Sequence, residues 1–320
     1  MNARDSKSWA EDGDRRCRLS STGLLKISYH RAFTCAAVLL LLSASAVGSR
    51  ATDEGKTGAS EEGKTDLPKD TGSIGIFPIS KAACSSMQTH HVISAGVPVT
   101  CARLNLVRFS YVDFEGRRHD DGEIVVMDAV ATHVFRIFAS LFQRGFPIGK
   151  ARLMDQYGGN DDASMADDNT SGFNGRKITG GSSFSLHAYG LAIDINPLQN
   201  PYVKRTGGKL SFSPPAGVKY ARRFGDRPNR NSAGMAETVI DVFANEGFLI
   251  WGGHWHDPID YQHFQVRGRI LAEQLRKLAP ARAAALFDQQ VERHRACVGH
   301  DPSHSARMKC ALAADSRLRG

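Results

Sequence analysis

The sequence predicts an α+β fold in which a small antiparallel sheet is flanked by helices. Two kinds of segment support this class: short runs rich in branched and aromatic residues, and longer runs that repeat apolar residues with a helical period. They are segregated along the chain rather than regularly alternating, which argues against a doubly wound parallel sheet. The expected strands are residues 104–111, 123–127, 190–195, 248–251 and 264–266, and the expected helices are residues 129–145, 233–245 and 269–295.

The first two expected strands form a hairpin. Between them lie residues 113–116, Asp-Phe-Glu-Gly, which suit a turn. The helix over residues 129–145 follows, and Gly145 and Pro147 end it. Its apolar stripe consists of Val130, Val134, Ile137, Phe138, Leu141 and Phe142.

Irregular stretches separate the later elements. Residues 158–181 are polar and glycine-rich, and a loop of this length inside a compact domain is usually functional or disordered. A second irregular stretch is expected from residue 196 to residue 231. The helix over residues 233–245 stops at Gly247, and one basic helix is expected over residues 269–295.

The N-terminal region predicts export. Residues 32–46 form an apolar run that follows Lys26 and Arg31 and ends in Ala-Ser-Ala, which is the layout of a secretory signal. The run is shorter than the roughly 20 residues that a bilayer span needs, so no stable membrane span is expected after cleavage. Because the segment before the run is long for a signal, either translation starts downstream of Met1 or the run stays as an uncleaved anchor. We favour cleavage after Ala46.

The expected organisation follows from these features. A signal peptide covers residues 1–46, and a flexible linker covers residues 47–73, which contain almost no large apolar residue and cannot bury a core. One folded domain is expected over residues 74–290, with a C-terminal tail over residues 291–320. The mature protein is expected to be exported, and to be periplasmic or associated with the cell wall.

Four cysteines remain after the signal, namely Cys84, Cys101, Cys297 and Cys310. An even number of cysteines in an exported protein suggests disulfides. Three connectivities are possible, and the two short loops Cys84–Cys101 and Cys297–Cys310 are the simplest. No two of the four are spaced as C-x-x-C, which disfavours a cysteine zinc site.

The formal net charge is +8, of which residues 1–46 contribute 7 − 4 = +3, so a mature chain would carry +5. A modest positive excess suits an anionic partner such as cell wall, nucleic acid or membrane surface, and it serves simple solubility equally well. The basic residues are scattered and are dense only in the final helix. Because nucleic-acid binding requires a cluster with interleaved aromatics, we expect no nucleic-acid partner. The sequence makes no prediction of the oligomeric state.

The segment from Ser185 to Asp194 carries the first functional signal. If it enters a strand from a loop, Gly190, Ala192 and Asp194 point to one face, with His187 at the mouth of that face. Two small residues beside a carboxylate leave room for a ligand, and a buried carboxylate is costly unless it is paired. Histidine and aspartate are both ordinary zinc ligands. The opposite face, directed to the core, carries Leu191, Ile193 and Ile195.

A second segment, Asp-Tyr-Gln-His-Phe-Gln-Val over residues 260–266, supplies the remaining groups. Phe264 and Val266 point inward, so His263 and Gln265 share the opposite face. His187, Asp194 and His263 give the three protein ligands of a catalytic zinc ion, which keeps a fourth position for water. Asp260 lies three residues before His263 and is the candidate general base. A lone histidine is usually structural, but here strand phase and spacing agree in two distant segments.

Both segments resemble a known family. S-x-H-x-x-G-x-A-x-D from Ser185 to Asp194, followed by D-x-x-H-F from Asp260, is similar to the VanY-like D-alanyl-D-alanine carboxypeptidases and the related L-alanyl-D-glutamate endopeptidases. The wider group includes lysostaphin-type enzymes and the Hedgehog signalling domain. The resemblance extends from roughly residue 104 to residue 266. It implies that His187, Asp194 and His263 bind one Zn²⁺ and that Asp260 is the base. It also implies that Arg176 stabilises the oxyanion, a role that suits a permanently charged guanidinium.

Other polar residues near the motifs are harder to assign. Ser185 either hydrogen-bonds substrate or caps the loop. His254-Trp255-His256 mimics the H-x-H pair of lysostaphin-type peptidases, but the spacing of His187 and Asp194 differs from theirs. We therefore expect His254 and His256 to lie in the substrate cleft or behind the ligands, with a surplus surface pair as the equal alternative.

The domain over residues 74–290 is accordingly expected to be a zinc peptidase that hydrolyses an amide bond in peptidoglycan stem peptides, as a D,D-carboxypeptidase or an endopeptidase. The alternative is a non-catalytic zinc-containing module of the Hedgehog type, which binds the wall or another ligand. The presence of both Asp260 and Arg176 argues against that alternative.

Overall fold

The structure is a computed structural model that describes residues 72–221, 223, 232–299, 301, 303, 305–307, 309 and 310. The expected signal peptide and all but the last two residues of the expected linker lie outside the described residues. Those that are described fall in one compact unit over residues 65–320. Among them, no helix has the length and apolar character that a membrane crossing would need.

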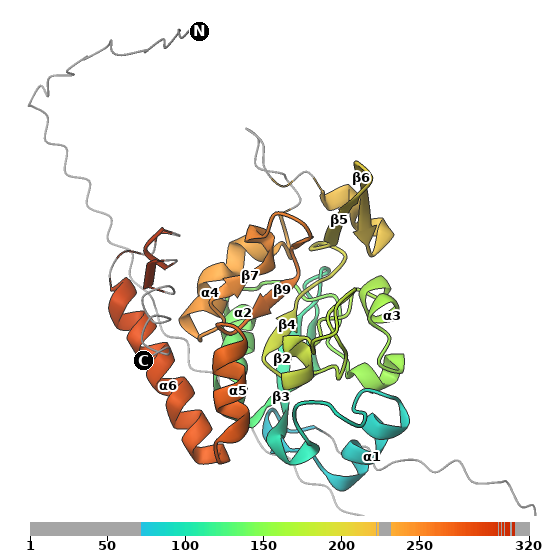
Figure 1. Cartoon of the computed structure of the whole chain (residues 1–320). Helices are drawn as coiled ribbons and strands as arrows, with labels where there is room; N and C mark the ends of the chain where they lie inside the picture. The colour runs from blue at the N-terminus through green and yellow to red at the C-terminus, as the bar shows by residue number, and fades with distance from the viewer. Residues whose placement is uncertain are drawn as a thin grey trace, which may run out of the picture. The chain divides into compact units, whose positions relative to one another are not determined.

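The described residues form three antiparallel sheets of three strands each, together with α-helices, so the α+β class is confirmed (Figure 1). The first sheet has the order β1-β2-β3, the second β4-β9-β7 and the third β6-β5-β8. The strands are β1 (Gly75–Pro78), β2 (Leu104–Val112), β3 (Arg118–Met127), β4 (Ala192–Asp194), β5 (Tyr202–Thr206), β6 (Lys209–Ser213), β7 (Ile250–Trp251), β8 (Ile259–Asp260) and β9 (His263–Gln265). The α-helices are α1 (Lys81–Thr89), α2 (Ala131–Gln143), α3 (Asp161–Ala166), α4 (Ile240–Asn245), α5 (Arg269–Lys277) and α6 (Pro280–Val298).

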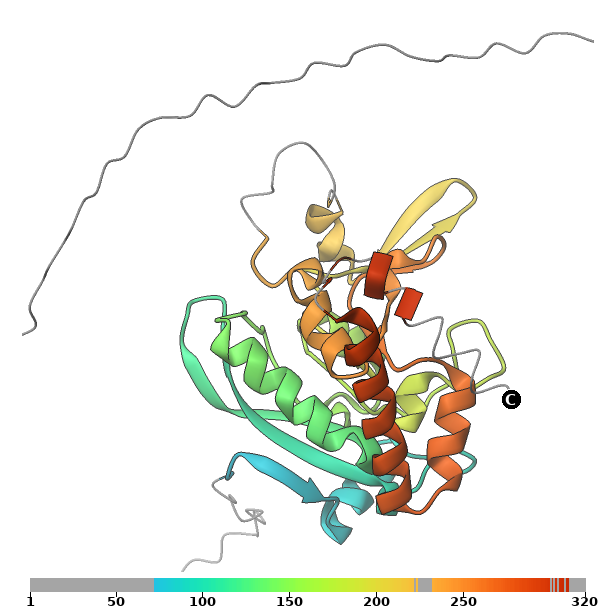
Figure 2. The same ribbon diagram turned by 90° about the vertical axis from the view of Figure 1, so that its left-hand side faces the viewer.

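The predicted hairpin and the helix after it are both present and pack against each other. Strands β2 and β3 pair antiparallel, and α2 lies along them (Figure 2). The Phe109 and Phe138 rings stack between strand and helix with centroids 3.7 Å apart. The buried face of α2 is the apolar stripe that the sequence showed, apart from Phe142, which is only partly buried. Burial of this stripe is what fixes α2 on the sheet.

The second sheet joins the two segments that carry the candidate ligands. Strand β9 lies between β4 and β7, and Asp194 is directly opposite His263 in the β4–β9 register. Ile193 and Phe264 are fully buried on the core side, where the Phe264 ring stacks on Phe243 with centroids 3.9 Å apart. The predicted strand phase is therefore confirmed for both segments, since their polar residues share the other face.

Three predicted features of the middle of the chain were wrong. The stretch after residue 195 contains the β5–β6 hairpin, whose turn glycines Gly207 and Gly208 both have positive φ. A Gly-Gly pair between two short strands is a recognisable hairpin signal that we did not use. The loop over residues 158–181 contains α3, which Asn160 caps by accepting a hydrogen bond from the Ala163 N–H. The helix expected over residues 233–245 is a 3₁₀ turn, Ala236–Val239, followed by α4.

The C-terminal helix is also not continuous. It breaks between α5 and α6, which lie side by side (Figure 2). Pro280 starts α6, where its missing N–H removes no helical hydrogen bond. Arg103 holds the end of α5 by donating to the carbonyls of Leu275, Arg276 and Leu278 while it pairs with Asp128. The N-terminal β1 and α1 were not predicted either.

Both expected disulfides are present. Cys84–Cys101 joins α1 to the turn that precedes β2, and Cys297–Cys310 joins the end of α6 to the segment that follows it. The two short loops are thus the connectivity that the protein uses.

Candidate metal centre and its cleft

The three candidate ligands lie on a 3₁₀ turn and on the two paired strands β4 and β9. His187 lies on a 3₁₀ turn, Leu186–Tyr189, which Ser185 caps by accepting a hydrogen bond from the His187 N–H at 3.3 Å. Gly190 ends the turn with a φ of 68°, and a Cβ there would lie 2.4 Å from the Met127 nitrogen of β3. Only glycine fits this position, so the G of the motif sets how His187 enters the site.

The ligand atoms of the three side chains form a compact triangle. His187 Nε2 lies 3.1 Å from His263 Nδ1 and 3.2 Å from Asp194 Oδ1, and His263 Nδ1 lies 2.9 Å from Asp194 Oδ1. Ligand atoms about 2.05 Å from a tetrahedral zinc ion would lie about 3.3 Å apart. The triangle is thus close to one face of a zinc tetrahedron. All three residues are buried, and the group could hold a metal ion.

Hydrogen bonds behind the two histidines direct their lone pairs into this triangle. His187 Nδ1 donates to the Gly172 carbonyl oxygen at 2.6 Å, which leaves Nε2 as the acceptor. His263 Nε2 lies 2.9 Å from Gln265 Oε1, which can only accept, so a neutral ring that donates to Gln265 has its lone pair on Nδ1. With neutral rings, three electron-pair donors therefore face one point with no proton between them. Such a donor set fits a cation.

The charges of the site are strongly coupled. Burial by itself would raise the pKa of Asp194, but the two histidines outweigh it and hold that pKa well below its usual range. Burial lowers the pKa of His263, and the hydrogen bond and charge of Asp194 reverse this and raise it. Asp194 is therefore ionised at ordinary pH, as a metal ligand must be.

The pKa of Asp260 is raised, whereas that of Asp194 is lowered. Asp260 lies on β8, where it pairs with Tyr202 of β5, and it is partly buried. Its Oδ1 has no hydrogen-bond partner among the described residues. Burial and the negative charge of Asp194 raise its pKa from 3.8 to about 6. A carboxylate whose pKa lies near neutral pH, beside a candidate cation site, is suited to accept a proton and to return it.

The ligands and Asp260 open into one cleft of about 540 Å³. Arg176 and Ser185 also line it, as do Tyr202 and Lys204 from the β5–β6 hairpin. Arg176 forms an ion pair with Asp161 at the start of α3, and Asp161 also accepts a hydrogen bond from Asn174 at 2.7 Å. The structure therefore brings the predicted base, the predicted oxyanion donor and the candidate ligands to the same cleft.

The two extra histidines are placed differently. His254 and His256 are exposed, and neither belongs to the residues that line the cleft. The His254 ring stands edge-on against Trp251 with centroids 4.8 Å apart. It is Trp255, between them, that lines the cleft, with its ring centroid 5.4 Å from that of His263.

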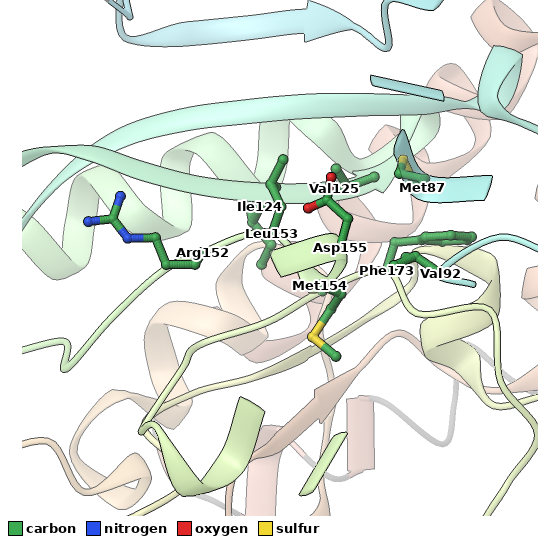
Figure 3. A pocket seen from close by; sticks show the side chains of 10 residues that line it. Met87, Val92, Ile124, Val125, Arg152, Leu153, Met154, Asp155 and Phe173 are labelled. Atoms are coloured by element: carbon green, nitrogen blue, oxygen red, sulfur yellow. The ribbon is translucent and has the colours of Figure 1, made fainter. Parts of the chain in front are cut away.

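A second, much smaller cavity lies between β3 and the 3₁₀ turn Met154–Tyr157 and shares no lining residue with the cleft (Figure 3). Its volume is about 10 Å³, the space of about one water molecule. Asp155 projects into it beside Ile124 and Val125 and accepts a hydrogen bond from Ser86 at 2.6 Å. It is too small for a substrate.

Comparison with known proteins agrees with this geometry. A family model described as D-alanyl-D-alanine carboxypeptidase matches residues 179–266, which include all three candidate ligands and Asp260 but not Arg176. The resemblance to the VanY-like zinc peptidases is therefore confirmed, and the match supports a peptidase of the D-alanyl-D-alanine carboxypeptidase type. No curated protein and no solved structure matches the chain.

Some residues of the cleft were not singled out in the sequence. Asp161 lies in the stretch that we expected to be a loop. Lys204 lies in the stretch that we expected to be irregular. Gln265 had been placed on the ligand face without a role. The signal that was available for Gln265 was its position two residues after His263, on the same side of the strand.

Proposed function

We propose that this protein is an exported zinc peptidase that hydrolyses an amide bond in peptidoglycan stem peptides, as a D,D-carboxypeptidase or an endopeptidase. The observation that carries the proposal is the triangle of His187, Asp194 and His263, open to the same cleft as Asp260. Zinc fits the donor set because two imidazole nitrogens and one carboxylate oxygen are its ordinary ligands, and a fourth position is left open toward the cleft.

The residues that line the cleft would then have different roles in the reaction. Zinc held by the three ligands would polarise the substrate carbonyl and lower the pKa of a water molecule. Asp260 accepts a proton from the attacking water, and its raised pKa lets it return that proton to the leaving amine. Arg176 donates to the oxygen of the carbonyl as negative charge develops on it. Ser185 shapes the cleft by capping the turn that carries His187.

Export and the wall substrate rest on the sequence. The apolar run over residues 32–46 has the layout of a secretory signal, and two disulfides suit an oxidising compartment. A positive mature chain would be attracted to an anionic wall.

The reaction can be identified with the purified, zinc-loaded protein and purified sacculi. We expect soluble products with new amino groups, and mass spectrometry of the muropeptides will name the bond. Loss of a single terminal residue would define a carboxypeptidase, and cleavage within the stem an endopeptidase. If the protein binds sacculi but leaves every muropeptide intact, the proposal is wrong and a binding module of the Hedgehog type takes its place.

Arg176 can be tested by a change that keeps its charge. Arg176→Lys removes the planar pair of donors, so we expect kcat to fall about 10- to 100-fold with little change in zinc affinity. The matched control is Arg205→Lys on the outer face of the β5–β6 hairpin, which should retain full activity. Unchanged kcat in Arg176→Lys would remove Arg176 from the oxyanion role.

A further inference from the structure

Gln265 is the polar residue closest in sequence to a candidate ligand on the same face of β9. Across the sheet it is opposite Ala192 of β4 on one side and Ile250 of β7 on the other. Ala192 is small and fully buried, so the Gln265 side chain has space to lie over β4 beside His263. It lines the cleft but is not one of the three atoms of the metal triangle.

In the contact between Gln265 and His263, the glutamine oxygen is the acceptor and the imidazole is the donor. Gln265 Oε1 lies 2.9 Å from His263 Nε2, and a carbonyl oxygen only accepts, so this contact is a hydrogen bond when the imidazole carries a proton on Nε2. A neutral imidazole has one N–H, which leaves the lone pair on Nδ1. That atom faces Asp194 Oδ1 at 2.9 Å and His187 Nε2 at 3.1 Å.

The alternative tautomer would remove the lone pair that His263 offers to a metal ion. With the proton on Nδ1, His263 would donate to Asp194 and close the triangle with an internal hydrogen bond in place of an ion. Asp194 favours this competing state because its carboxylate is an excellent acceptor at the observed distance. A group on the far side of the ring is therefore needed to hold the proton on Nε2, and among the described residues Gln265 makes that contact.

We propose that Gln265 is the positioning residue that sets the tautomer and orientation of His263, so that Nδ1 is presented to the metal. The proposal rests on the metal-binding part of the proposed function, although not on the substrate. Gln265 does for His263 what the Gly172 carbonyl does for His187, with a side chain in place of backbone.

Two substitutions separate the acceptor from the shape of the side chain. Gln265→Glu keeps an acceptor at the same reach, whereas Gln265→Met keeps the length and removes the acceptor. We expect Gln265→Met to raise the Kd for zinc about 10- to 100-fold, measured by competition with a chromogenic chelator. Gln265→Glu should stay within a few-fold of the wild type. The matched control is Gln290→Met, because Gln290 is more buried than the partly buried Gln265 but lies on α6 and does not line the cleft.

A second measurement needs neither substrate nor metal. Nitrogen NMR of the metal-free wild type, at a pH where the ring is neutral, should show His263 protonated on Nε2, and Gln265→Met should shift the population toward the Nδ1-protonated form. An Nδ1-protonated ring in the wild type would overturn the proposal, and so would an unchanged zinc Kd in Gln265→Met. Because zinc affinity and tautomer are measured without peptide, failure of the peptidase assay would leave these results standing.

Discussion

Asp260→Asn is expected to reduce peptide hydrolysis by about 10²- to 10⁴-fold while leaving zinc bound. Asparagine fills the same space beside β5, but it can neither accept the proton of the attacking water nor return it to the leaving amine. Zinc affinity should change little, because Asp260 is not one of the three atoms of the metal triangle. The measurement is the initial rate of product release from sacculi, with zinc content determined on the same samples.

The same substitution is expected to stabilise the metal-free protein. Folding raises the pKa of Asp260 from 3.8 to about 6, chiefly by burial and then by the charge of Asp194. Between these two values the folded state binds more protons than the unfolded state, so the free energy of unfolding falls as the pH rises. Above both pKa values the ionised Asp260 lowers the free energy of unfolding by its full amount, roughly 3 kcal/mol for a shift of about two pKa units.

A neutral asparagine does not titrate, so this cost is absent from Asp260→Asn. Urea unfolding of the metal-free proteins should therefore show the variant to be more stable at neutral pH, and the difference should vanish as the pH falls below about 4. The matched control is Asp162→Asn, an exposed carboxylate that lines the same cleft. A variant that keeps its activity, or one that gains no stability at neutral pH, contradicts the assignment of Asp260 as a partly buried base with a raised pKa.

The activity of the wild type should also depend on the ionisation of Asp260. Only the carboxylate accepts a proton, so the rate must fall as the pH drops below its pKa. A nearby cation favours the charged form, so the acidic limb of the pH profile should lie at or below about pH 6 once zinc is bound.

Strand phase is the reason that the metal centre could be predicted from the sequence. In a strand, side chains alternate between faces, so Asp194 and His263 had to point away from the buried Ile193 and Phe264. The two segments then needed only to pair in register, and the structure pairs Asp194 directly with His263. The spacing of the motif also located His187, because the Gly190 turn leaves little freedom before β4.

The surroundings of the centre could not be predicted in the same way. Strand β8 has only two residues and exists because it pairs with β5, so no periodic pattern could indicate how Asp260 is held. The ion pair between Arg176 and Asp161 joins α3 to the loop that follows it, and such a contact depends on how that loop folds back rather than on a periodic pattern in the sequence. The separation of α5 from α6 was within reach, since Pro280 is a helix-starting signal.

Asp194→Ala is expected to abolish both zinc binding and hydrolysis. Asp194 Oδ1 is the one anionic corner of the triangle, and it lies within 3.2 Å of both histidine nitrogens. Without it, two neutral imidazoles remain, which are too few to retain a catalytic zinc ion. Treatment of the wild type with a chelator should lower its activity to that of Asp194→Ala, and added zinc should restore only the wild type.

Thermal unfolding gives a readout of the same ligand set that does not depend on substrate. An ion that binds only the folded state at about 100 times its Kd stabilises it by about 2.7 kcal/mol, which corresponds to a rise in Tm of roughly 5–10 °C for a domain of this size. We expect this rise in the wild type and in the control Asp162→Ala, and none in Asp194→Ala. If zinc raises the Tm of Asp194→Ala as much as that of the wild type, the metal lies elsewhere. The exposed His254 and His256 are then the first pair to substitute, because their H-x-H spacing is also a metal-binding pattern.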